Sequence, residues 1–451
     1  MIRSDLSNNR PISTLPFLAK IMERAVVWQL QPHLESNNIF DEYQSGFRPG
    51  RGTETTMIKV KDDCLWAMDN DEASALILLD LSAAFDTVDH ARLLERLVSV
   101  AGLEDMALTW MASFLQNRTQ RVRLGTYYSS NSSLSCGVPQ GSALSPILFN
   151  IYIRPLLYII QRHNLRFHVY ADDTQIYFKL PKNEKVQVDL ASCLEEIQSW
   201  MGANYLKLNG SKTECIIISN QSKTSLTDFP SWPASFMPSP TLATQVRDLG
   251  IIVDSKLSLK AQVNQVVSAC YYQLKLLRST FHFIDEVDKV HVINAFIGSR
   301  LDYCNALYMG CPKTLLHKLQ LIQNAAARLL TGVGRRDHIT PSLKALHWLP
   351  VAERVLFKVG CIVHKAIHKI GPGYLQETFT CYVPNRSLRS ADQANLIVPK
   401  FRRTRCGGRT LDAQGSTFWN SLPLYIRREK DLLKFRTFLK TFLFFQVYGP
   451  N

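Results

Sequence analysis

The chain has 451 residues, of which 46% are hydrophobic and 20% are charged, a composition typical of folded proteins rather than of disordered chains. Its uninterrupted apolar runs, such as residues 75–79, are far shorter than the roughly 18 to 20 residues that cross a bilayer, so we expect no membrane contact. The ten cysteines stand singly, and the first residues lack the apolar segment of a secretion signal, which together favour an intracellular protein.

Charge is divided unevenly along the chain. Residues 1–220 hold 21 Lys and Arg against 24 Asp and Glu, a net charge of −3, whereas residues 221–451 hold 31 against 14, a net charge of +17. The two values sum to the +14 of the whole chain. Carboxylates that hold metal ions in one half and cations that hold phosphate in the other suit a nucleic-acid enzyme, although a solvated basic surface gives the same balance.

Apolar periodicity predicts the elements of the first half. It indicates a buried strand over residues 75–79 and helices over residues 18–34, 93–98 and 143–160. Pro146 and Pro155 are expected to bend or interrupt the last of these helices. Two β-prone runs flank the polar turn 171–174, so we expect a hairpin with two acids at its tip.

The second half is predicted to begin with a long loop and to continue as helices. A helix over residues 190–201 and a strand over residues 215–218 precede a Ser- and Pro-rich loop over residues 219–244. Amphipathic stripes then predict helices over residues 259–277 and 315–330. Beyond residue 341 the pattern weakens, with a basic stretch at residues 400–409 and a last helix over residues 432–445.

Three acids stand where predicted strands end. Asp80 follows the buried strand, and Asp172 with Asp173 occupies the predicted hairpin tip. Acids in such positions repel one another unless divalent cations lie between them, and hard cations such as Mg²⁺ prefer carboxylate oxygens. Paired metal ions of this kind catalyse phosphoryl transfer. Each acid alone is more commonly a turn residue or a helix cap, so only the combination indicates a catalytic site.

Several segments resemble the motifs of reverse transcriptases. YADD (residues 170–173) is similar to their catalytic box, and LLDLSAAFDTVDH (78–90) to their first acidic motif. Five further segments match finger, nucleotide-site, palm and primer-grip motifs in family order: RPIS (10–13), QSGFRPGRGT (44–53), GVPQGSALSPILFNIYI (137–153), LKLNGSKTE (206–214) and VRDLGIIVD (246–254). A lone YADD is weak, but the ordered set is specific. Three later segments resemble the polymerases of LINE-type, non-LTR retrotransposons: ARLLTG (327–332), RDHITPSLKALHWLPV (336–351) and FWNSLP (418–423).

This resemblance implies an α+β fold of the right-hand polymerase type, with an antiparallel palm sheet, a helical thumb and a basic C-terminal region. We expect partial fingers at residues 1–74, the palm at 75–255, the thumb at 256–340 and the basic region at 341–451. The implied activity is that of an RNA-directed DNA polymerase, a nucleotidyltransferase that adds dNTPs to the 3′-OH of a DNA primer on an RNA template. The implied cofactor is a pair of Mg²⁺ ions, with Mn²⁺ as a substitute.

The resemblance also implies the catalytic residues. Asp80, Asp172 and Asp173 match the carboxylates that ligate the two ions, and Lys212 matches a palm lysine that protonates departing pyrophosphate. A lone lysine beside a strand is otherwise simply solvated.

Four residues match the family's nucleotide site. Arg10 matches a finger arginine that contacts the triphosphate, and Phe85 matches an aromatic residue that blocks a ribose 2′-OH. Gln140 and Gly141 precede the predicted helix 143–160, where small residues let backbone amides approach a nucleotide. Core packing by Phe85 and a helix cap at Ser142 are the alternatives.

Two groups of residues in the second half of the chain are candidates for ligand binding. Arg402, Arg403 and Arg405 belong to the basic stretch, and we expect them to contact nucleic-acid phosphates. Cys361, His364 and His368 have the spacing of one helix face, which suits zinc, but an amphipathic helix explains the same spacing and no fourth ligand is evident.

Two other functions remain open at this point. A catalytically silent remnant of a retroelement would bind nucleic acid only, and a splicing cofactor of the group II intron maturase kind would share the palm. The family's complete polyproteins have an upstream endonuclease and longer fingers, whereas Arg10 lies close to Met1, so we expect an N-terminally truncated polymerase. We expect it to work in a nuclear or cytoplasmic ribonucleoprotein.

Overall fold

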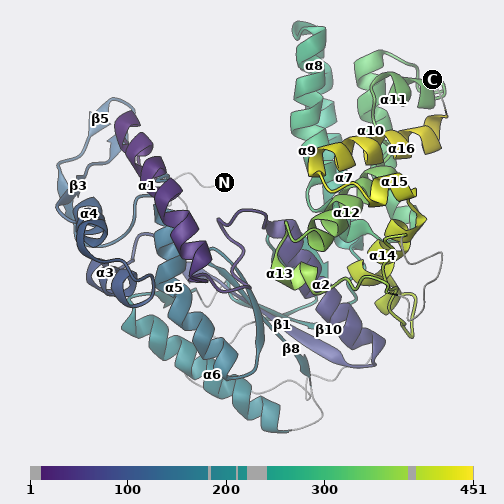
Figure 1. The fold of residues 1–451 in the computed structure, drawn as a ribbon. Helices are drawn as coiled ribbons and strands as arrows, with labels where there is room; N and C mark the ends of the chain where they lie inside the picture. Colours follow the sequence, from purple (N-terminus) through teal and green to yellow (C-terminus); the bar gives the residue numbers. More distant parts are fainter. Residues whose placement is uncertain (1–11, 181–183, 210–211, 221–240, 384–392, 450–451) are drawn as a thin grey trace. The chain divides into compact units, whose positions relative to one another are not determined.

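The computed structural model describes residues 12–180, 184–209, 212–220, 241–383 and 393–449 (Figure 1). The chain divides into two compact units. Unit 1 comprises residues 1–49, 76–215 and 225–242, and unit 2 comprises residues 50–75, 216–224 and 243–451. These units do not delimit fingers, palm and thumb, so that division stays a prediction.

Unit 1 has one long and mostly buried helix, α5 (Ser145–Arg162), among its helices. The others are α1 (Phe17–Ser36), α3 (His90–Ser99), α4 (Asp105–Leu115) and α6 (Glu184–Ala203). Helix α5 contacts α3, α6 and β7, and its side chains Leu148, Phe149 and Ile151 are fully buried. The predicted helices are confirmed. Pro146 lies in the first turn of α5, where no helical N–H is needed, and the helix runs uninterrupted through Pro155.

A five-stranded sheet has the order β11-β10-β1-β8-β7. Its strands are β1 (Ala73–Leu79), β7 (Arg166–Tyr170), β8 (Asp173–Leu180), β10 (Glu214–Ile218) and β11 (Thr241–Ala243). The apolar run of β1 is almost entirely buried, as its lack of polar alternation predicts. The predicted strands 75–79 and 215–218 are confirmed, whereas residues 221–240 of the predicted loop lie outside the described residues.

The predicted acidic hairpin is β7–β8, and its turn is shorter than predicted. The strands are antiparallel, with Tyr170 opposite Asp173 and Val169 opposite Thr174. Thr174 is polar, which suggests a turn residue, but it is buried within β8. The turn therefore consists of Ala171, whose φ is 61°, and Asp172.

Three short antiparallel ladders belong to unit 1. Strand β2 (Leu81–Ser82) pairs with β9 (Lys207–Leu208). The other two ladders follow α4: β3 (Arg118–Gln120) pairs with β6 (Ser132–Leu134), and β4 (Arg123–Leu124) pairs with β5 (Tyr127–Tyr128).

Unit 2 is mainly helical. It contains α2 (Thr53–Asp69) and one hairpin formed by β12 (Gln245–Asp248) and β13 (Ile251–Asp254). Its following helices are α7 (Lys260–Thr280), η3 (Phe281–Phe283), α8 (Glu286–Ile293), the π-helical η4 (Asn294–Gly298), α9 (Ser299–Asp302), η5 (Asn305–Tyr308), α10 (Lys313–Thr331) and α11 (Thr340–Ala345). The last are α12 (Val351–Ile367), α13 (Gly373–Gln376), η6 (Gly407–Arg409), α14 (Leu411–Ser421), α15 (Leu424–Arg427) and α16 (Leu432–Tyr448).

The region after residue 341 is more helical than its weak pattern indicates. Helix α12 contacts α14 and α16, and the fully buried Trp419 and Phe435 belong to those two helices. At Gly360 a Cβ would lie 2.6 Å from a methyl carbon of Leu439, so this glycine permits close packing of α12 and α16. Within the described part of the chain, none of the helices combines the length and apolarity needed to cross a membrane.

Candidate active site

Asp80 directly follows β1 and is half-buried. Its backbone oxygen accepts a hydrogen bond of 2.9 Å from the backbone N–H of Asn209. Immediately afterwards Leu81 pairs with Leu208, so the β2–β9 ladder continues the same connection. The segment after β1 is thereby fixed to the segment that contains the predicted lysine.

The second acidic segment begins at the neighbouring strand. Strand β8 lies next to β1 in the sheet and starts at Asp173, which is exposed, while Asp172 in the turn is half-buried. Asp80 therefore follows one strand, while Asp172 precedes the neighbouring strand and Asp173 begins it.

Helix α5 contacts segments next to both acidic positions. The ring of Phe149 stacks on that of Phe85, with centroids 4.6 Å apart and an interplanar angle of 24°. The next residue, Asn150, donates a side-chain hydrogen bond of 2.9 Å to the backbone oxygen of Gly46. Gly46 in turn packs on the hairpin turn, because a Cβ there would lie 2.3 Å from the backbone nitrogen of Ala171. Two successive residues of α5 thus hold the segment after Asp80 and, through Gly46, the turn of the β7–β8 hairpin.

Residues 43–46 also hold the hairpin by backbone hydrogen bonds. The N–H of Val169 donates to the oxygen of Tyr43 at 2.9 Å, and the N–H of Ser45 donates to the oxygen of Val169 at 2.8 Å. The side-chain oxygen of Gln44 accepts from Gly46 at 2.9 Å and from Ala171 at 3.4 Å. This segment overlaps a predicted finger motif, but its contact with the β7–β8 hairpin is not predicted from the sequence.

The loop before α5 contacts the segment after Asp80. The backbone N–H of Val138 donates to the oxygen of Phe85 at 2.8 Å. The side-chain amide of Gln140 donates to both carboxylate oxygens of Asp86, each at 2.9 Å. Sequence reasoning missed Asp86, although it directly follows Phe85 within the same acidic motif. Gly141 has a φ of 102°, a conformation that favours glycine.

Leu144 is the N-cap residue of α5, so the alternative interpretation of Ser142 as the helix cap is wrong, and Ser142 lies in the turn before the helix. Its hydroxyl accepts from the N–H groups of Leu144 and Ser145 at 3.1 and 3.2 Å. The hydroxyl also donates to the buried carboxylate of Glu23 at 2.6 Å, and Ala143 N–H donates to the same oxygen at 2.7 Å. Glu23 is a further residue that sequence reasoning missed, since nothing in α1 marks its partner.

The remaining predicted residues of unit 1 differ in how closely they join this site. Lys212 is exposed. Its backbone N–H donates at 3.0 Å to the backbone oxygen of Asn209, whose own N–H donates to Asp80. Arg10 lies outside the described residues.

The carboxylates provide suitable donors for a hard cation. Asp80 and Asp172 are both partly accessible, and their oxygen atoms are the donors that Mg²⁺ prefers. Among the residues that the structure describes, no three His, Cys, Asp or Glu side chains are grouped closely enough to form an ion site. The chemistry of the donors therefore fits Mg²⁺, while the three predicted carboxylates do not converge into one cluster.

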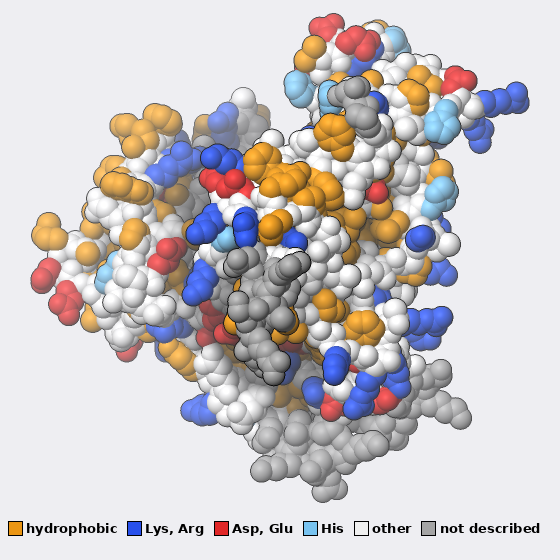
Figure 2. Space-filling model, turned by 45° about the vertical axis from the view of Figure 1, so that its right-hand side comes forward, with side chains coloured by type: hydrophobic (Ala, Val, Ile, Leu, Met, Phe, Trp, Pro, Cys, Tyr) orange, Lys and Arg blue, Asp and Glu red, His pale blue; other side chains and the backbone are white. Residues whose placement is uncertain are grey.

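The predicted phosphate-binding arginines belong to unit 2 and are not equivalent. The backbone N–H groups of Arg402 and Arg403 each donate to the side-chain carboxylate of Asp69 at 2.8 Å. Burial opposes ionisation of Asp69, but these bonds outweigh it and lower the pKa of its carboxyl. The side chain of Arg403 pairs with Asp71 at 2.5 Å, whereas those of Arg402 and Arg405 are exposed. In Figure 2, Lys and Arg side chains are spread in small groups over the face in view.

The Cys361, His364 and His368 group has packing partners. His364 Nε2 lies 2.8 Å from the backbone oxygen of Glu429, and its ring stacks on Phe435 with centroids 4.2 Å apart. Burial lowers the pKa of His364 and raises the pKa of Cys361 to about 11. The amphipathic character of α12 explains these contacts, because it turns His364 toward neighbouring buried side chains such as Phe435.

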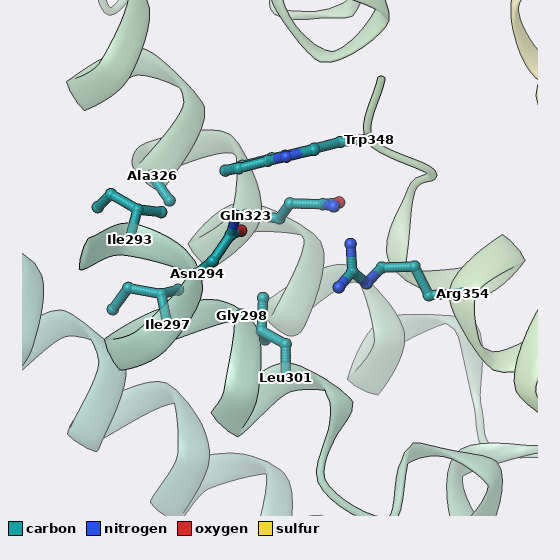
Figure 3. A pocket seen from close by; sticks show the side chains of 9 residues that line it. All are labelled: Ile293, Asn294, Ile297, Gly298, Leu301, Gln323, Ala326, Trp348 and Arg354. Carbon is teal, nitrogen blue, oxygen red and sulfur yellow. The ribbon is translucent and has the colours of Figure 1, made fainter. Parts of the chain in front are cut away.

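A pocket in unit 2 contains none of the predicted site residues (Figure 3). It lies among η4, α10 and the segment around Trp348. Two of its polar side chains already have partners, because Arg354 pairs with Asp302 and Gln323 donates to the oxygen of Leu349 at 2.8 Å. The candidate active site is therefore the carboxylate region of unit 1.

The chain resembles several known proteins. Residues 3–253 match the family model described as reverse transcriptase (RNA-dependent DNA polymerase). The chain is 26% identical over 341 residues to the RNA-directed DNA polymerase from mobile element jockey of Drosophila melanogaster, covering 73% of this chain and 36% of that protein. It is 25% identical over 338 residues to the probable RNA-directed DNA polymerase from transposon X-element of the same fly, covering 72% and 35%.

The chain thus spans about a third of the length of these curated relatives, or 36% and 35%. Among solved structures, apo telomerase from Candida tropicalis aligns with a TM-score of 0.39 and 11% identity over 78% of this chain and 61% of that chain.

Proposed function

The chain belongs to the reverse transcriptase family, and from that premise we propose that it adds deoxynucleotides to the 3′-OH of a DNA primer on an RNA template. We further propose that it is the polymerase part of a non-LTR retrotransposon protein and works inside a ribonucleoprotein. The observation that carries the proposal is the contact of Phe149 and Asn150 with the segments beside the two acidic positions.

The carboxylates have the central role in this proposal. Asp80 and Asp172 would hold two Mg²⁺ ions, or Mn²⁺ as a substitute, with Asp173 supporting the second. Such ions stabilise the attacking and leaving oxygens of an in-line phosphoryl displacement. The protein's part is to keep the two acidic segments in register, which supports the assignment because α5 and residues 43–46 fix them by buried contacts.

Other residues would orient the nucleotide and the leaving group. Phe85 is held by its stack on Phe149 and would contact the deoxyribose. The amides around Gln140 and Gly141, together with Arg10, would contact the triphosphate, and Lys212 would protonate pyrophosphate. Fingers, palm, thumb and basic region are assigned to residues 1–74, 75–255, 256–340 and 341–451, with Arg402, Arg403 and Arg405 on the nucleic-acid backbone.

Primer extension tests the proposal. With a DNA primer annealed to an RNA template, dNTPs and Mg²⁺, the purified chain is expected to extend the primer. Asp172→Asn keeps the side-chain size and removes its charge, and should lower the rate by about 100-fold or more, because removing a metal ligand takes away several kcal/mol of transition-state stabilisation.

Asp105→Asn is the matched control. Asp105 is an exposed acid at the start of α4, and Asn accepts its left-handed backbone, whose φ is 48°. Equal extension by the Asp172→Asn and Asp105→Asn variants would contradict the proposed site. Template binding without any extension by the unaltered chain would favour the binding-only alternative.

A further inference from the structure

The segment after α4 forms an exposed arm of two successive ladders, β3–β6 and β4–β5 (Figure 1). Every residue from 119 to 133 is exposed. The turn of the outer ladder consists of Gly125 and Thr126, and the φ of 63° at Gly125 suits the first position of a tight hairpin turn. An arm this exposed adds little to the core, so its side chains are open to another role.

The arm is cationic. It contains Arg118, Arg121 and Arg123, and the sequence has no Asp or Glu between Asp105 and Asp172. Local carboxylates therefore cannot neutralise these arginines from within the segment. A cationic surface without acids attracts polyanions.

The outer ladder has two different faces. Arg123 lies opposite Tyr128, so both project from the same face, and Arg121 lies two residues away on that face. The guanidinium carbons of Arg121 and Arg123 lie 4.3 and 5.6 Å from the centre of the Tyr128 ring. The arginines are therefore pre-positioned on an aromatic support rather than extended freely into water.

The opposite face is apolar. Leu124 and Tyr127 are paired across the ladder and are 80% and 81% exposed, and Val122 projects from the same face. The ladder keeps its form through its own hydrogen bonds, since Ser129 N–H donates to the Val122 oxygen at 2.9 Å and the Ser129 hydroxyl accepts from Val122 N–H at 2.9 Å. At the base, Arg118 donates to the oxygen of Phe114 at 3.2 Å and covers its ring.

We propose that the arm of residues 118–134 binds single-stranded nucleic acid. The arginines contact phosphates, and the exposed Tyr127 and Leu124 contact unstacked bases. A combination of guanidinium groups and exposed aromatic rings fits a single strand, whose bases present their faces for stacking, better than a duplex, whose bases are stacked internally. The choice of RNA as the strand rests on the proposed function.

The test measures binding of a fluorescently labelled oligouridine without a primer, by anisotropy, at several salt concentrations. Arg121→Ala/Arg123→Ala should weaken binding most at low salt. If both arginines neutralise phosphates, the log-log salt slope should become shallower by about 1.4, because each phosphate contact on a single strand contributes about 0.7.

Arg154→Ala is the matched control. Arg154 covers Tyr158 at 5.3 Å, and Tyr158 is 50% exposed, against 51% for Tyr128. The control removes one arginine of the same kind from α5 and should leave the slope nearly unchanged. The proposal is overturned if the double variant binds oligouridine as tightly as the control at every salt concentration.

A second variant examines the apolar face. Leu124→Ser/Tyr127→Ser should weaken oligouridine binding while leaving the salt slope unchanged, because the net charge stays the same. Unchanged binding in this variant overturns the proposed role of this face. Both outcomes are independent of the proposed polymerase activity, since no primer or dNTP is present, and circular dichroism confirms that the exposed substitutions leave the fold intact.

Discussion

Unit 1 contains two hairpins with two-residue turns and opposite properties. The β7–β8 hairpin has Asp172 in its turn and is buried along most of both strands, whereas the β4–β5 hairpin has Arg123 beside its turn and is exposed throughout. The buried hairpin is held by residues 43–46, which are more than a hundred residues away in the chain. The hydrogen bonds given above for the exposed outer ladder join its own residues.

On the proposed functions, the difference shows how each kind of chemistry is supported within one unit. Phosphoryl transfer requires carboxylates fixed to a fraction of an ångström, so their turn is held by rigid neighbours. Contacts to a flexible strand tolerate movement, so an exposed arm is sufficient for the proposed binding. With the proposed roles, one kind of secondary structure would serve fixed chemistry or adaptable binding according to what packs against it.

The largest effect is expected from loosening the buried hairpin. Gly46→Ala would bring a Cβ to 2.3 Å from the Ala171 nitrogen, so the turn must move. We expect primer extension to fall about 100-fold or more and stability to fall by roughly 1–3 kcal/mol, as for overpacked cores. Extension rates and thermal unfolding measure the two effects.

Gly202→Ala is the control for this change. Gly202 lies in the last turn of α6, and a Cβ there meets nothing within 4 Å. Alanine should stabilise the helix by up to about 1 kcal/mol and leave extension unchanged. If Gly46→Ala behaves like Gly202→Ala, the buried turn does not depend on residues 43–46.

The next largest effect is a change in sugar selectivity, expected from replacing Phe85, whose ring stacks on Phe149 of α5. Phe85→Ala should raise the use of ribonucleotides relative to dNTPs by about tenfold or more, because an open space would admit a 2′-OH. Phe85 is only half-buried, so the stability loss should be smaller than the roughly 3–5 kcal/mol of a buried Phe→Ala change. Competition between ATP and dATP in single-nucleotide addition measures the ratio.

Phe149→Leu separates the two roles of this aromatic pair. It removes the stack seen at 4.6 Å but leaves Phe85 itself in the loop. We expect it to lower stability with little change in sugar selectivity. Equal loss of selectivity in both variants would mean that packing, rather than direct contact with the sugar, sets the preference.

The sequence predicts the elements of unit 1 well because their patterns are local. The apolar run of β1 and the helical stripe of α5 each depend on neighbours in the chain. The long-range contacts are different: Gly46 meets Ala171 through backbone atoms, and Glu23 meets Ser142, so neither pair leaves a pattern in composition or spacing. Charge alone suggested a phosphate role for Arg403, whereas its partner Asp71 belongs to a distant segment.

The buried carboxylate of Asp62 in unit 2 contrasts with the partly accessible Asp172 of the β7–β8 turn. Burial raises the pKa of Asp62 from 3.8 to about 6, although Lys61 and the N–H of Leu411 partly offset it. Since the folded state then binds the proton more tightly than the unfolded state, the stability contribution is present below about pH 4 and is lost as pH rises through 6. The loss amounts to about 3 kcal/mol at most.

Asp62→Asn should remove this dependence. Its side-chain oxygen can still accept from Leu411, and the amide has no charge to bury. Chemical unfolding at several pH values between 4 and 7 should show the unaltered protein losing stability relative to the variant. A constant difference across this range would mean that Asp62 keeps one protonation state.

The smallest effect is expected from the basic stretch of unit 2. Arg402→Ala/Arg405→Ala should flatten the salt dependence of duplex DNA binding by about 0.9 for each phosphate that the variant no longer neutralises, because both side chains are exposed. Arg403→Ala should change the slope least, since its guanidinium pairs with Asp71. Filter binding at several salt concentrations measures the three slopes. If Arg403→Ala flattens the slope as much as the double variant does, the pair with Asp71 opens when nucleic acid binds, and this stretch is then as adaptable as the exposed arm of unit 1.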